Sequence, residues 1–481
     1  MNKKMVFNTV GRIVLLEAFL FLLPMAVSVY YWDLAELKAF GISCLVALLV
    51  GGVTVLLTKT KDRVIYAKEG FVIVALAWIA LSLIGCLPFY ISRQIPNFID
   101  AFFETVSGFT TTGSSVVPDV TKLTNGILFW RSFTHWVGGM GVLVFIVALI
   151  PNLSDRPIHM LRAEMPGPTA SKLMPKLKDT AKILYLIYIA LTLAEIFSLK
   201  IAGLSWFSAV VHSFGTAGTG GFGIKPDSIG GYSPTVQWII TVFMLVFGIN
   251  FNMYYLVLIR RARAIFKSAE FWTYVGIVAV CTAIISINVA PLFNTVGDTV
   301  RNSAFQVASL ITTTGYATTD FNLWPGLARG IMFILLFTGG CAGSTAGGLK
   351  LSRVVLLFKT VKREFKKLVN PRSVSVVRFE GKPVEEETLS SISVYFAVYI
   401  MCFVAIFLIL CLEPFSFETN LTAAATTFNN VGPGFDAVGP AANFAAYSGF
   451  SKIILSISML LGRLEIYPLL IAFIPSTWTK K

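Results

Sequence analysis

The sequence predicts an all-α integral membrane protein made of four tandem repeats, preceded by an extra pair of N-terminal helices. The 481-residue chain is 56% hydrophobic and only 13% charged, which leaves too little polar surface for a soluble domain. Apolar stretches of membrane-spanning length recur along the whole chain. Four short segments rich in glycine and threonine also resemble one another, and each lies between two of these stretches.

The apolar stretches account for the membrane-spanning helices in order. The leading pair is expected near residues 8–30 and 38–57, and Glu17 with no small-residue cleavage site favours a retained helix over a signal peptide. The long apolar stretches, each close to the roughly 17–25 residues that cross a bilayer core, include 42–57 within this pair and then 127–150, 183–199, 239–259 and 396–412. Since no soluble domain fits between them, we expect one integral membrane unit.

Positive charge follows a topological pattern. The net charge is +14, and the lysines and arginines concentrate in short hydrophilic segments, namely 3–4, 59–68, 156–182, 260–267, 350–382 and 480–481. The alternate connections contain few basic residues, which is the positive-inside pattern and predicts that both termini and the basic loops are cytoplasmic. The charge therefore indicates contact with lipid headgroups, and no nucleic-acid partner is expected.

Residue types that carry enzymatic chemistry are scattered. The six cysteines lie in apolar stretches without ligand spacing, and the three histidines are His135, His159 and His212. No glycine loop joined to a strand and a helix is present to cradle phosphates. Nothing here indicates an enzyme, and we expect no organic cofactor on this chain.

The four similar segments share a spacing. They read SGFTTTGSS, HSFGTAGTG, SLITTTGYA and TTFNNVGPG and begin at residues 107, 212, 309 and 426. When they are aligned on their apolar residue, each places a glycine four positions later. The aligned pairs are Phe109 with Gly113, Phe214 with Gly218, Ile311 with Gly315, and Phe428 with Gly432.

About a dozen semi-apolar residues precede each segment. A helix of that length reaches only ~18 Å, too short to span a bilayer. A short helix followed by irregular backbone at membrane depth is typical of a re-entrant pore loop. We therefore predict helix–pore-loop–helix repeats in a pseudo-fourfold arrangement around one ion pore. The expected boundaries are 1–66 for the leading pair and 67–155, 156–268, 269–382 and 383–481 for the repeats.

The residue types in these loops suit a dehydrated cation. Backbone carbonyls can replace the water shell of potassium, and glycine allows the positive φ that turns successive carbonyls toward one axis. The short helices would also point their partially negative C-terminal ends at the cavity. The alternative is that threonine- and glycine-rich turns only pack helices together.

The motifs carry a family resemblance. TTTG at 110–113, TTTGYATTDFN at 312–322 and NNVGPGFD at 429–436 resemble the TrkH/KtrB/HKT superfamily of potassium transporters, and the TrkH branch most of all. In that superfamily a serine in place of the first-repeat glycine is associated with sodium preference, so Gly113 favours potassium. The loops match only part of the longer signature of classical potassium channels, which suggests a shorter filter with looser discrimination. Rubidium and, less well, sodium are therefore expected as further permeant ions. The resemblance implies a filter of Thr111, Thr112, Gly113, Thr216, Ala217, Gly218, Thr313, Thr314, Gly315, Asn430, Val431 and Gly432.

Acidic residues follow each loop. They are Asp119, Asp227, Asp320 and Asp436. A ring of carboxylates at an outer vestibule would concentrate cations. The alternative is turn chemistry, because Pro-Asp dipeptides are common in turns.

The second helix of repeat 3 contains an anomalous stretch, GGCAGSTAGGLK at 339–350. Each glycine costs a helix about 1 kcal/mol, so a regular helix is not expected. The candidate gate residues are Gly339, Gly340, Gly343, Ser344, Thr345, Gly347 and Gly348. Close helix packing is the alternative, and the resemblance implies an intramembrane gating loop.

Arg463 is the second gate candidate, because a charge near mid-bilayer faces a cavity or a partner. It could pair with Glu465 or stand beside the ion path as a repulsive barrier, and the resemblance favours the barrier. The polar run 250–252 on repeat 2 could share that cavity.

The resemblance also implies the biological setting. It implies potassium uptake through a gated, channel-like pore in the bacterial inner (plasma) membrane. It further implies a homodimer that binds a cytosolic nucleotide-binding regulatory subunit through the loops at 151–182 and 350–391. A proton- or sodium-coupled symporter is the alternative, and a buried acid such as Glu195 or Glu104 would then titrate.

Overall fold

The chain is mostly helical in the computed structural model, which describes residues 1–60, 66–141, 177–373 and 375–479. The helices are α1 (Lys3–Leu20), α2 (Leu22–Tyr30), α3 (Leu34–Leu57), α4 (Ala67–Gly85), α5 (Leu87–Ile91), α6 (Phe98–Phe109), α7 (Asn125–Gly139), α10 (Leu177–Ile201), α11 (Trp206–Ala217), α12 (Pro234–Phe247), α13 (Phe251–Leu258), α14 (Ala269–Val289), α15 (Val296–Ile311), α16 (Gly326–Phe337), α17 (Leu351–Val369), α18 (Glu386–Leu410), α19 (Phe417–Phe428), α20 (Gly449–Arg463) and α21 (Tyr467–Phe473). One antiparallel hairpin pairs β1 (Arg378–Phe379) with β2 (Lys382–Pro383).

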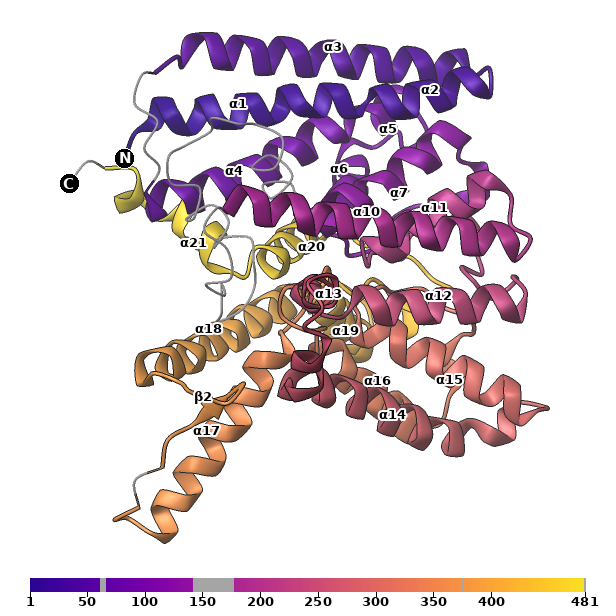
Figure 1. Cartoon of the computed structure of the whole chain (residues 1–481). Coiled ribbons are helices and arrows are strands. Elements are labelled where there is room, and N and C mark those ends of the chain that lie inside the picture. Colours follow the sequence, from indigo (N-terminus) through magenta and orange to yellow (C-terminus); the bar gives the residue numbers. More distant parts are fainter. Residues whose placement is uncertain (61–65, 142–176, 374, 480–481) are drawn as a thin grey trace.

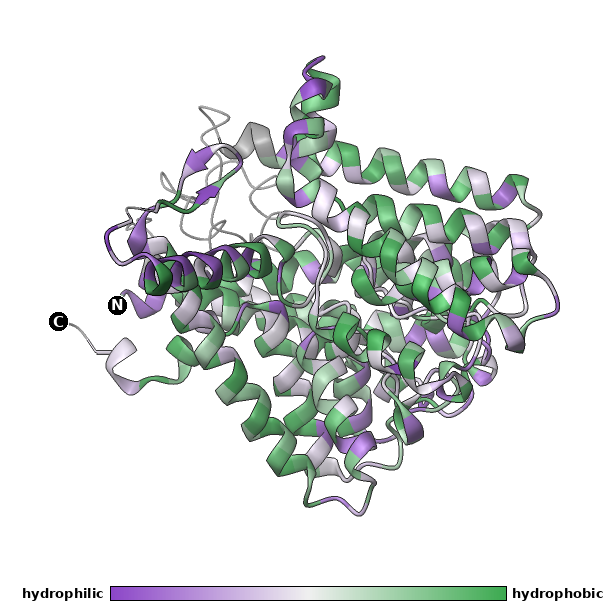
Figure 2. Ribbon diagram, turned by 90° about the horizontal axis from the view of Figure 1, so that it is seen from below, coloured by the Kyte–Doolittle hydropathy of each residue, from purple (hydrophilic) through white to green (hydrophobic). Residues whose placement is uncertain are grey.

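Six helical segments of the described chain are long and apolar enough to cross a membrane, and α12 with α13 forms a further, bent candidate. The apolar colour of these segments contrasts with the hydrophilic α17 and hairpin (Figure 2). Both termini lie at the end of the molecule from which α17 and the hairpin project (Figure 1). This arrangement agrees with the charge pattern, which assigns the termini and the basic connection after α17 to one side.

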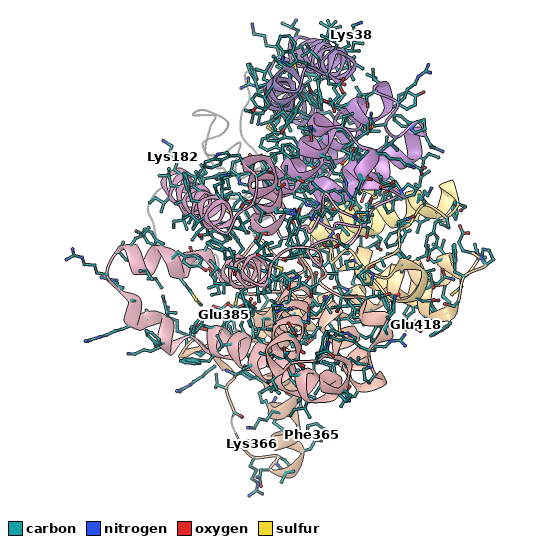
Figure 3. The ribbon with its side chains drawn as sticks, turned by 90° about the vertical axis from the view of Figure 1, so that its right-hand side faces the viewer. Lys38, Lys182, Phe365, Lys366, Glu385 and Glu418 are labelled. Atoms are coloured by element: carbon teal, nitrogen blue, oxygen red, sulfur yellow. The ribbon has the colours of Figure 1, made fainter. Side chains whose placement is uncertain are left out.

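Each repeat consists of a long first helix, a short pore helix and a second helix. The pore helices are α6, α11, α15 and α19, and the second helices begin with α7, α12, α16 and α20. Each second helix packs against the pore helix of the next repeat: α7 on α11, α12 on α15, α16 on α19, and α20 back on α6. The contacts close a ring, and the view along the helices shows the repeats around one centre (Figure 3). The predicted fold class is confirmed.

The extra N-terminal pair is bound to repeat 1. Helix α1 packs on α3 and α4, and α2 packs on α7. The buried carboxylate of Glu36 accepts hydrogen bonds from the backbone N–H groups of Gly126 (3.2 Å) and Ile127 (3.0 Å) at the start of α7. A carboxylate at a helix N-terminus satisfies free N–H groups and interacts favourably with the helix dipole.

The second helices break just below the pore loops. The sequence predicted a break only in repeat 3, but α12 and α13 meet at 88°. Residues 464–466 separate α20 from α21, and two of them, Glu465 and Ile466, have positive φ. Helix α7 ends at Gly139. The stretch 142–150 and the basic loop up to residue 176 lie outside the described residues. The break is therefore shared by repeats 2, 3 and 4, while the long glycine-rich insertion belongs to repeat 3.

Candidate functional site

All four pore helices are followed by the same backbone turn. In each turn two residues separated by one position adopt the left-handed region that favours glycine. These pairs are Thr111 (φ 55°) with Gly113 (80°), Thr219 (54°) with Gly221 (72°), Thr313 (55°) with Gly315 (81°), and Asn430 (55°) with Gly432 (103°). In each repeat the residue between the pair donates a backbone hydrogen bond to the last turns of its own pore helix, at 2.8–2.9 Å.

The register predicted for repeat 2 is wrong by three residues. Thr216 and Ala217 form the end of helix α11, and Gly218 is its C-cap with an ordinary φ of −70°. The turn equivalent to 111–113 is Thr219–Gly220–Gly221. The sequence alignment used Phe214, but the residue at the helix end is the fully buried Ala217.

The crowding behind this turn explains its many glycines. A Cβ atom on Gly218 would lie 2.2 Å from the carbonyl oxygen of His135, and one on Gly220 would lie 2.4 Å from the His135 ring. His135 comes from α7 of repeat 1, and nothing in the sequence near repeat 2 signals its presence. Glycine is required here because another chain segment fills the space of a side chain.

The four turns converge in a closed ring. A Cβ atom on each final glycine would lie within 3 Å of a carbonyl oxygen of an adjacent repeat. The contacts are Gly113 with Gly220 (2.0 Å), Gly221 with Thr314 (2.0 Å), Gly315 with Val431 (2.1 Å) and Gly432 with Thr112 (2.8 Å). No side chain fits between the strands at this level. The ring thus brings four equivalent sets of backbone carbonyls together, which is the geometry of a cation filter.

A small cavity lies on the outer side of the ring. Its volume is ≈ 130 Å³, and its lining includes the four final glycines, Gly113, Gly221, Gly315 and Gly432. None of the four predicted vestibule aspartates is among its described lining residues.

The aspartates make turn contacts instead. Asp119 accepts a hydrogen bond from the Thr121 N–H (3.0 Å), and Asp320 accepts one from the Asn322 N–H (3.0 Å). Asp436 accepts from the Thr419 hydroxyl (2.7 Å), and the backbone carbonyl of Asp227 accepts from Gly230 (2.9 Å). Hydrogen bonds from the Thr121 side chain and backbone lower the pKa of Asp119. The vestibule ring stays a prediction, and the turn alternative has direct contacts.

The glycine-rich insertion of repeat 3 is an irregular loop at 338–350, directly below the ring. The Gly347 N–H donates to the hydroxyl of Thr313 in the predicted filter (2.6 Å), and a Cβ atom on Gly347 would lie 2.8 Å from the Asn429 carbonyl oxygen. Gly343 and Gly348 have φ of 72° and 65°. The loop therefore touches the inner end of the predicted filter segments of repeats 3 and 4.

Two neighbouring elements anchor the loop. The break in repeat 2 accepts hydrogen bonds from the Cys341 N–H to the Gly248 carbonyl (3.0 Å) and from the Thr345 hydroxyl to the Phe247 carbonyl (3.2 Å). On the other side, the Glu270 carboxylate of α14 accepts from the Ala342 N–H (2.8 Å). Sequence reasoning missed Glu270, although an acidic residue at the start of an apolar helix was a usable signal.

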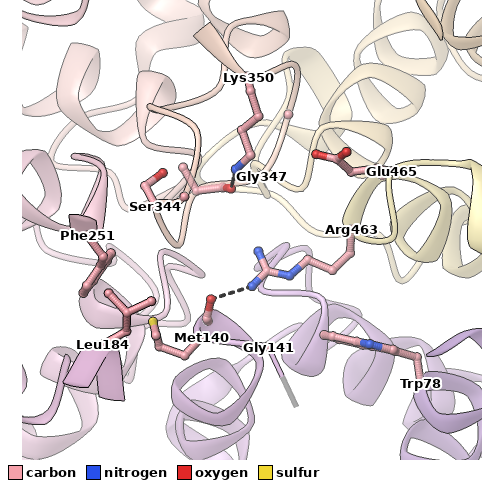
Figure 4. Close-up of a pocket in the computed structure, with 15 residues that line it drawn as sticks. Trp78, Met140, Gly141, Leu184, Phe251, Ser344, Gly347, Lys350, Arg463 and Glu465 are labelled. Atoms are coloured by element: carbon pink, nitrogen blue, oxygen red, sulfur yellow. Dashed lines mark hydrogen bonds between the residues drawn. The ribbon is translucent and has the colours of Figure 1, made fainter. Parts of the chain in front are cut away.

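Arg463 links the loop to repeat 1. Its Nη1 donates to the Thr345 carbonyl (2.9 Å), and its Nη2 donates to the Gly139 carbonyl at the end of α7 (2.8 Å). Figure 4 shows the guanidinium between the segment of Gly347 and Lys350 and the segment of Met140 and Gly141. Glu465, the predicted alternative partner, forms an ion pair with Arg353 at 2.5 Å. A small cavity of ≈ 70 Å³ beside Arg463 is lined by residues of the loop, such as Gly347, by Met140 and Gly141 after α7, and by Glu465.

Comparison with known proteins agrees with this architecture. The TrkH family model, described as cation transport protein, matches residues 36–480. The "Trk system potassium uptake protein TrkH" of Salmonella typhimurium is 36% identical over 99% of this chain and 100% of its own length. TrkG of Escherichia coli K12, also named a Trk system potassium uptake protein, is 33% identical over 99% and 98%.

A solved structure gives the same result for the fold. The crystal structure of the potassium transporter TrkH from Vibrio parahaemolyticus superimposes with a TM-score of 0.89 at 32% sequence identity, covering 100% of both chains. The match over the whole length includes the N-terminal pair and all four repeats. This chain belongs to the TrkH family of cation transport proteins.

Proposed function

We propose that this chain takes up potassium across the bacterial inner (plasma) membrane through a selective, gated, channel-like pore. The closed ring of four glycines and neighbouring carbonyls carries the proposal, because it supplies oxygen ligands without fixed charge on one axis. The names of the relatives, Trk system potassium uptake proteins, agree with this cargo. Rubidium and, less well, sodium would also permeate.

The filter is proposed to consist of residues 111–113, 219–221, 313–315 and 430–432. Their backbone carbonyls would replace the hydration shell of potassium, while the pore helices point their C-terminal ends at the axis. The boundaries 67–155, 156–268, 269–382 and 383–481 are retained as the proposed repeats of one pore per chain.

The gate is proposed to be the loop 338–350 together with Arg463. The backbone N–H of Gly347 donates a hydrogen bond to the Thr313 hydroxyl at the inner end of the proposed filter, and Arg463 adds a positive charge below it. Both features oppose the passage of a cation in this conformation. Conduction would require the loop to leave Thr313 and the hydrogen bonds of Arg463 to break.

The setting is proposed from the basic surfaces. The projecting α17 and its hairpin provide a cytosolic surface for a nucleotide-binding regulatory subunit, and the chain would work as a homodimer in contact with membrane lipid. Nucleotide would bind the regulatory subunit, since the sequence contains no phosphate-cradling glycine loop.

A proton- or sodium-coupled symporter is the second candidate function. Glu195 favours it, because this carboxyl group is fully buried on α10, the helix that packs against pore helix α11 of repeat 2. Glu104, the other acid considered, is buried and forms an ion pair with Arg131, so it already has a structural partner within repeat 1.

Flux through the purified protein in liposomes separates these functions. With a potassium gradient and a set voltage, we expect flux that reverses at the potassium equilibrium potential whatever the pH or sodium gradient. A reversal potential that moves with either gradient would establish coupling. No cation flux, with or without the regulatory subunit, would overturn the pore.

A further inference from the structure

We propose that Arg131 and Glu104 form a positioning pair that holds the outer strands of repeats 1 and 2 and thereby sets the cation selectivity of the pore. The inference rests on the proposed filter function, since it concerns the strands that continue outward from Gly113 and Gly221.

The two residues face each other behind the ring. Glu104 lies on pore helix α6, and Arg131 lies on the second helix α7 of the same repeat. Their side chains are 0% and 4% exposed, and Nε of Arg131 lies 2.5 Å from Oε1 of Glu104. A buried ion pair is stable only when further hydrogen bonds satisfy both partners, so the other contacts of each side chain are informative.

Glu104 holds the outer strand of repeat 1. Its Oε2 accepts a hydrogen bond from the Val116 N–H (2.9 Å), and the Ser115 hydroxyl donates to both carboxylate oxygens (3.0 and 3.2 Å). Ser115 and Val116 follow Gly113 by two and three residues. The carboxylate therefore fixes the direction in which this strand leaves the ring.

Arg131 holds the outer strand of repeat 2. Its Nη1 donates to the Gly223 carbonyl (3.0 Å), and its guanidinium lies 3.6 Å from the centre of the Phe222 ring. Phe222 and Gly223 directly follow the final glycine, Gly221. Arg131 also lines the outer cavity. Its planar guanidinium therefore connects the segment after Gly221 directly, and the segment after Gly113 through Glu104, beside the proposed ion path.

Only the first repeat has a charged residue at this place on its pore helix. The equivalent positions, counted from the helix ends, are His212, Gln306 and Ala423. His212 and Gln306 make neutral hydrogen bonds to the outer segments, to Tyr316 (3.4 Å) and to the Thr319 carbonyl (3.3 Å). Of the contacts at these four equivalent positions, the charged one therefore lies between repeats 1 and 2.

Relative permeability is the appropriate measurement, because it does not depend on how many molecules fold. We expect Arg131→Lys and Glu104→Gln to change the sodium-to-potassium permeability ratio by roughly fivefold or more, about 1 kcal/mol. Lysine keeps the positive charge but lacks the planar guanidinium, whose separate nitrogens donate to Glu104 and to the Gly223 carbonyl at once. Glutamine keeps the shape but removes the neutralising charge. Ser115→Ala, a milder change at the same strand, should shift the ratio in the same direction by less.

A matched ion pair serves as the control. Asp298 and Arg301 (2.7 Å) lie on the outer part of pore helix α15, and Arg301→Lys should leave the ratio unchanged. Unchanged ratios in Arg131→Lys, Glu104→Gln and Ser115→Ala would overturn the inference while wild-type selectivity stands. If the first two variants do not fold, an unchanged ratio in Ser115→Ala alone overturns it. A wild-type protein without selective flux would instead overturn the proposed function.

Discussion

The ring is made of four equivalent turns, whereas the layer below it is made of a different element from each repeat. In the ring, all four repeats supply the same turn with the same pair of positive-φ residues, and each turn is held by its own pore helix. In the layer below, repeat 3 supplies the loop 338–350, repeat 4 supplies Arg463, and repeat 2 supplies the break at Gly248. The described part of repeat 1 supplies the carbonyls at the end of α7 that accept from Arg463.

This difference indicates that the loop 338–350 can move more easily than the turns of the ring. Any shift of one turn in the ring must displace a neighbouring backbone, because the strands leave no room for a Cβ atom. The loop is held by a few separate hydrogen bonds from several elements, and each such bond contributes only about 0.5–1.5 kcal/mol, or 1.5–3 when one partner is charged. Changes in the ring should alter which ion passes, and changes in the lower layer should alter how much passes.

The largest expected effect comes from the ring. Gly221→Ser and Gly113→Ser would each force a Cβ atom into a neighbouring carbonyl and place a side chain at φ near 72° or 80°, a conformation that costs about 1–2 kcal/mol. We expect the potassium-to-sodium permeability ratio to fall by roughly tenfold.

Thr216→Ser is the matched control for the register of repeat 2. It keeps the hydroxyl that donates to the His212 carbonyl (3.0 Å) within α11, so selectivity should not change. A loss of selectivity in Thr216→Ser, with a normal Gly221→Ser protein, would restore the register predicted from the sequence.

The next effect concerns Arg463. Arg463→Gln removes the positive charge and the hydrogen bonds to repeats 1 and 3, so basal potassium flux in liposomes should rise by roughly tenfold with unchanged selectivity. The basal flux of Arg463→Lys should lie between those of wild type and Arg463→Gln, since lysine keeps the positive charge but lacks the several donor nitrogens of the guanidinium. Lower flux in Arg463→Gln would show that the arginine supports the open pore instead.

A smaller effect is expected at Glu270. Glu270→Ala leaves the Ala342 N–H without its acceptor, which costs about 1–3 kcal/mol if the group stays buried. Flux should therefore rise several-fold, by less than in Arg463→Gln, while Glu270→Gln, which keeps an acceptor oxygen, stays near wild type. Equal effects of the two substitutions would assign the role to charge and contradict the hydrogen-bond account.

The smallest effect is expected at the outer turns. Asp119 lies in a turn with Thr121 and Lys122, so Asp119→Asn should change the half-saturating potassium concentration less than about twofold at low salt. A severalfold increase that disappears at high salt would support the vestibule ring.

The sequence was sufficient for the features that depend on composition and short patterns. Hydrophobic stretches predicted the membrane helices, and the threonine- and glycine-rich turns of repeats 1 and 3 were located correctly because their pore helices end in a large apolar residue. Repeat 2 failed because α11 ends in Ala217, and the spacing then pointed to the wrong glycine. The shape of that turn depends on His135 from another repeat, which no local pattern can reveal.

The lower layer could be predicted only in outline. Five glycines at 339–348 indicated an irregular loop, and a lone arginine indicated a polar partner or cavity. The acceptors of Arg463 include backbone carbonyls 118 and 324 residues away, and every residue has such a carbonyl. Glu270 and the break at Gly248 also bind the loop through hydrogen bonds that involve backbone groups. Such contacts can be identified only in the folded structure, where the repeats lie together.

Locating rubidium in crystals of the protein by anomalous scattering tests the central claim most directly. The account predicts a peak on the axis of the ring, between the carbonyls of Thr112, Gly220, Thr314 and Val431. A peak at the level of Thr216 and Ala217, or none on the axis in crystals soaked with rubidium, would contradict it.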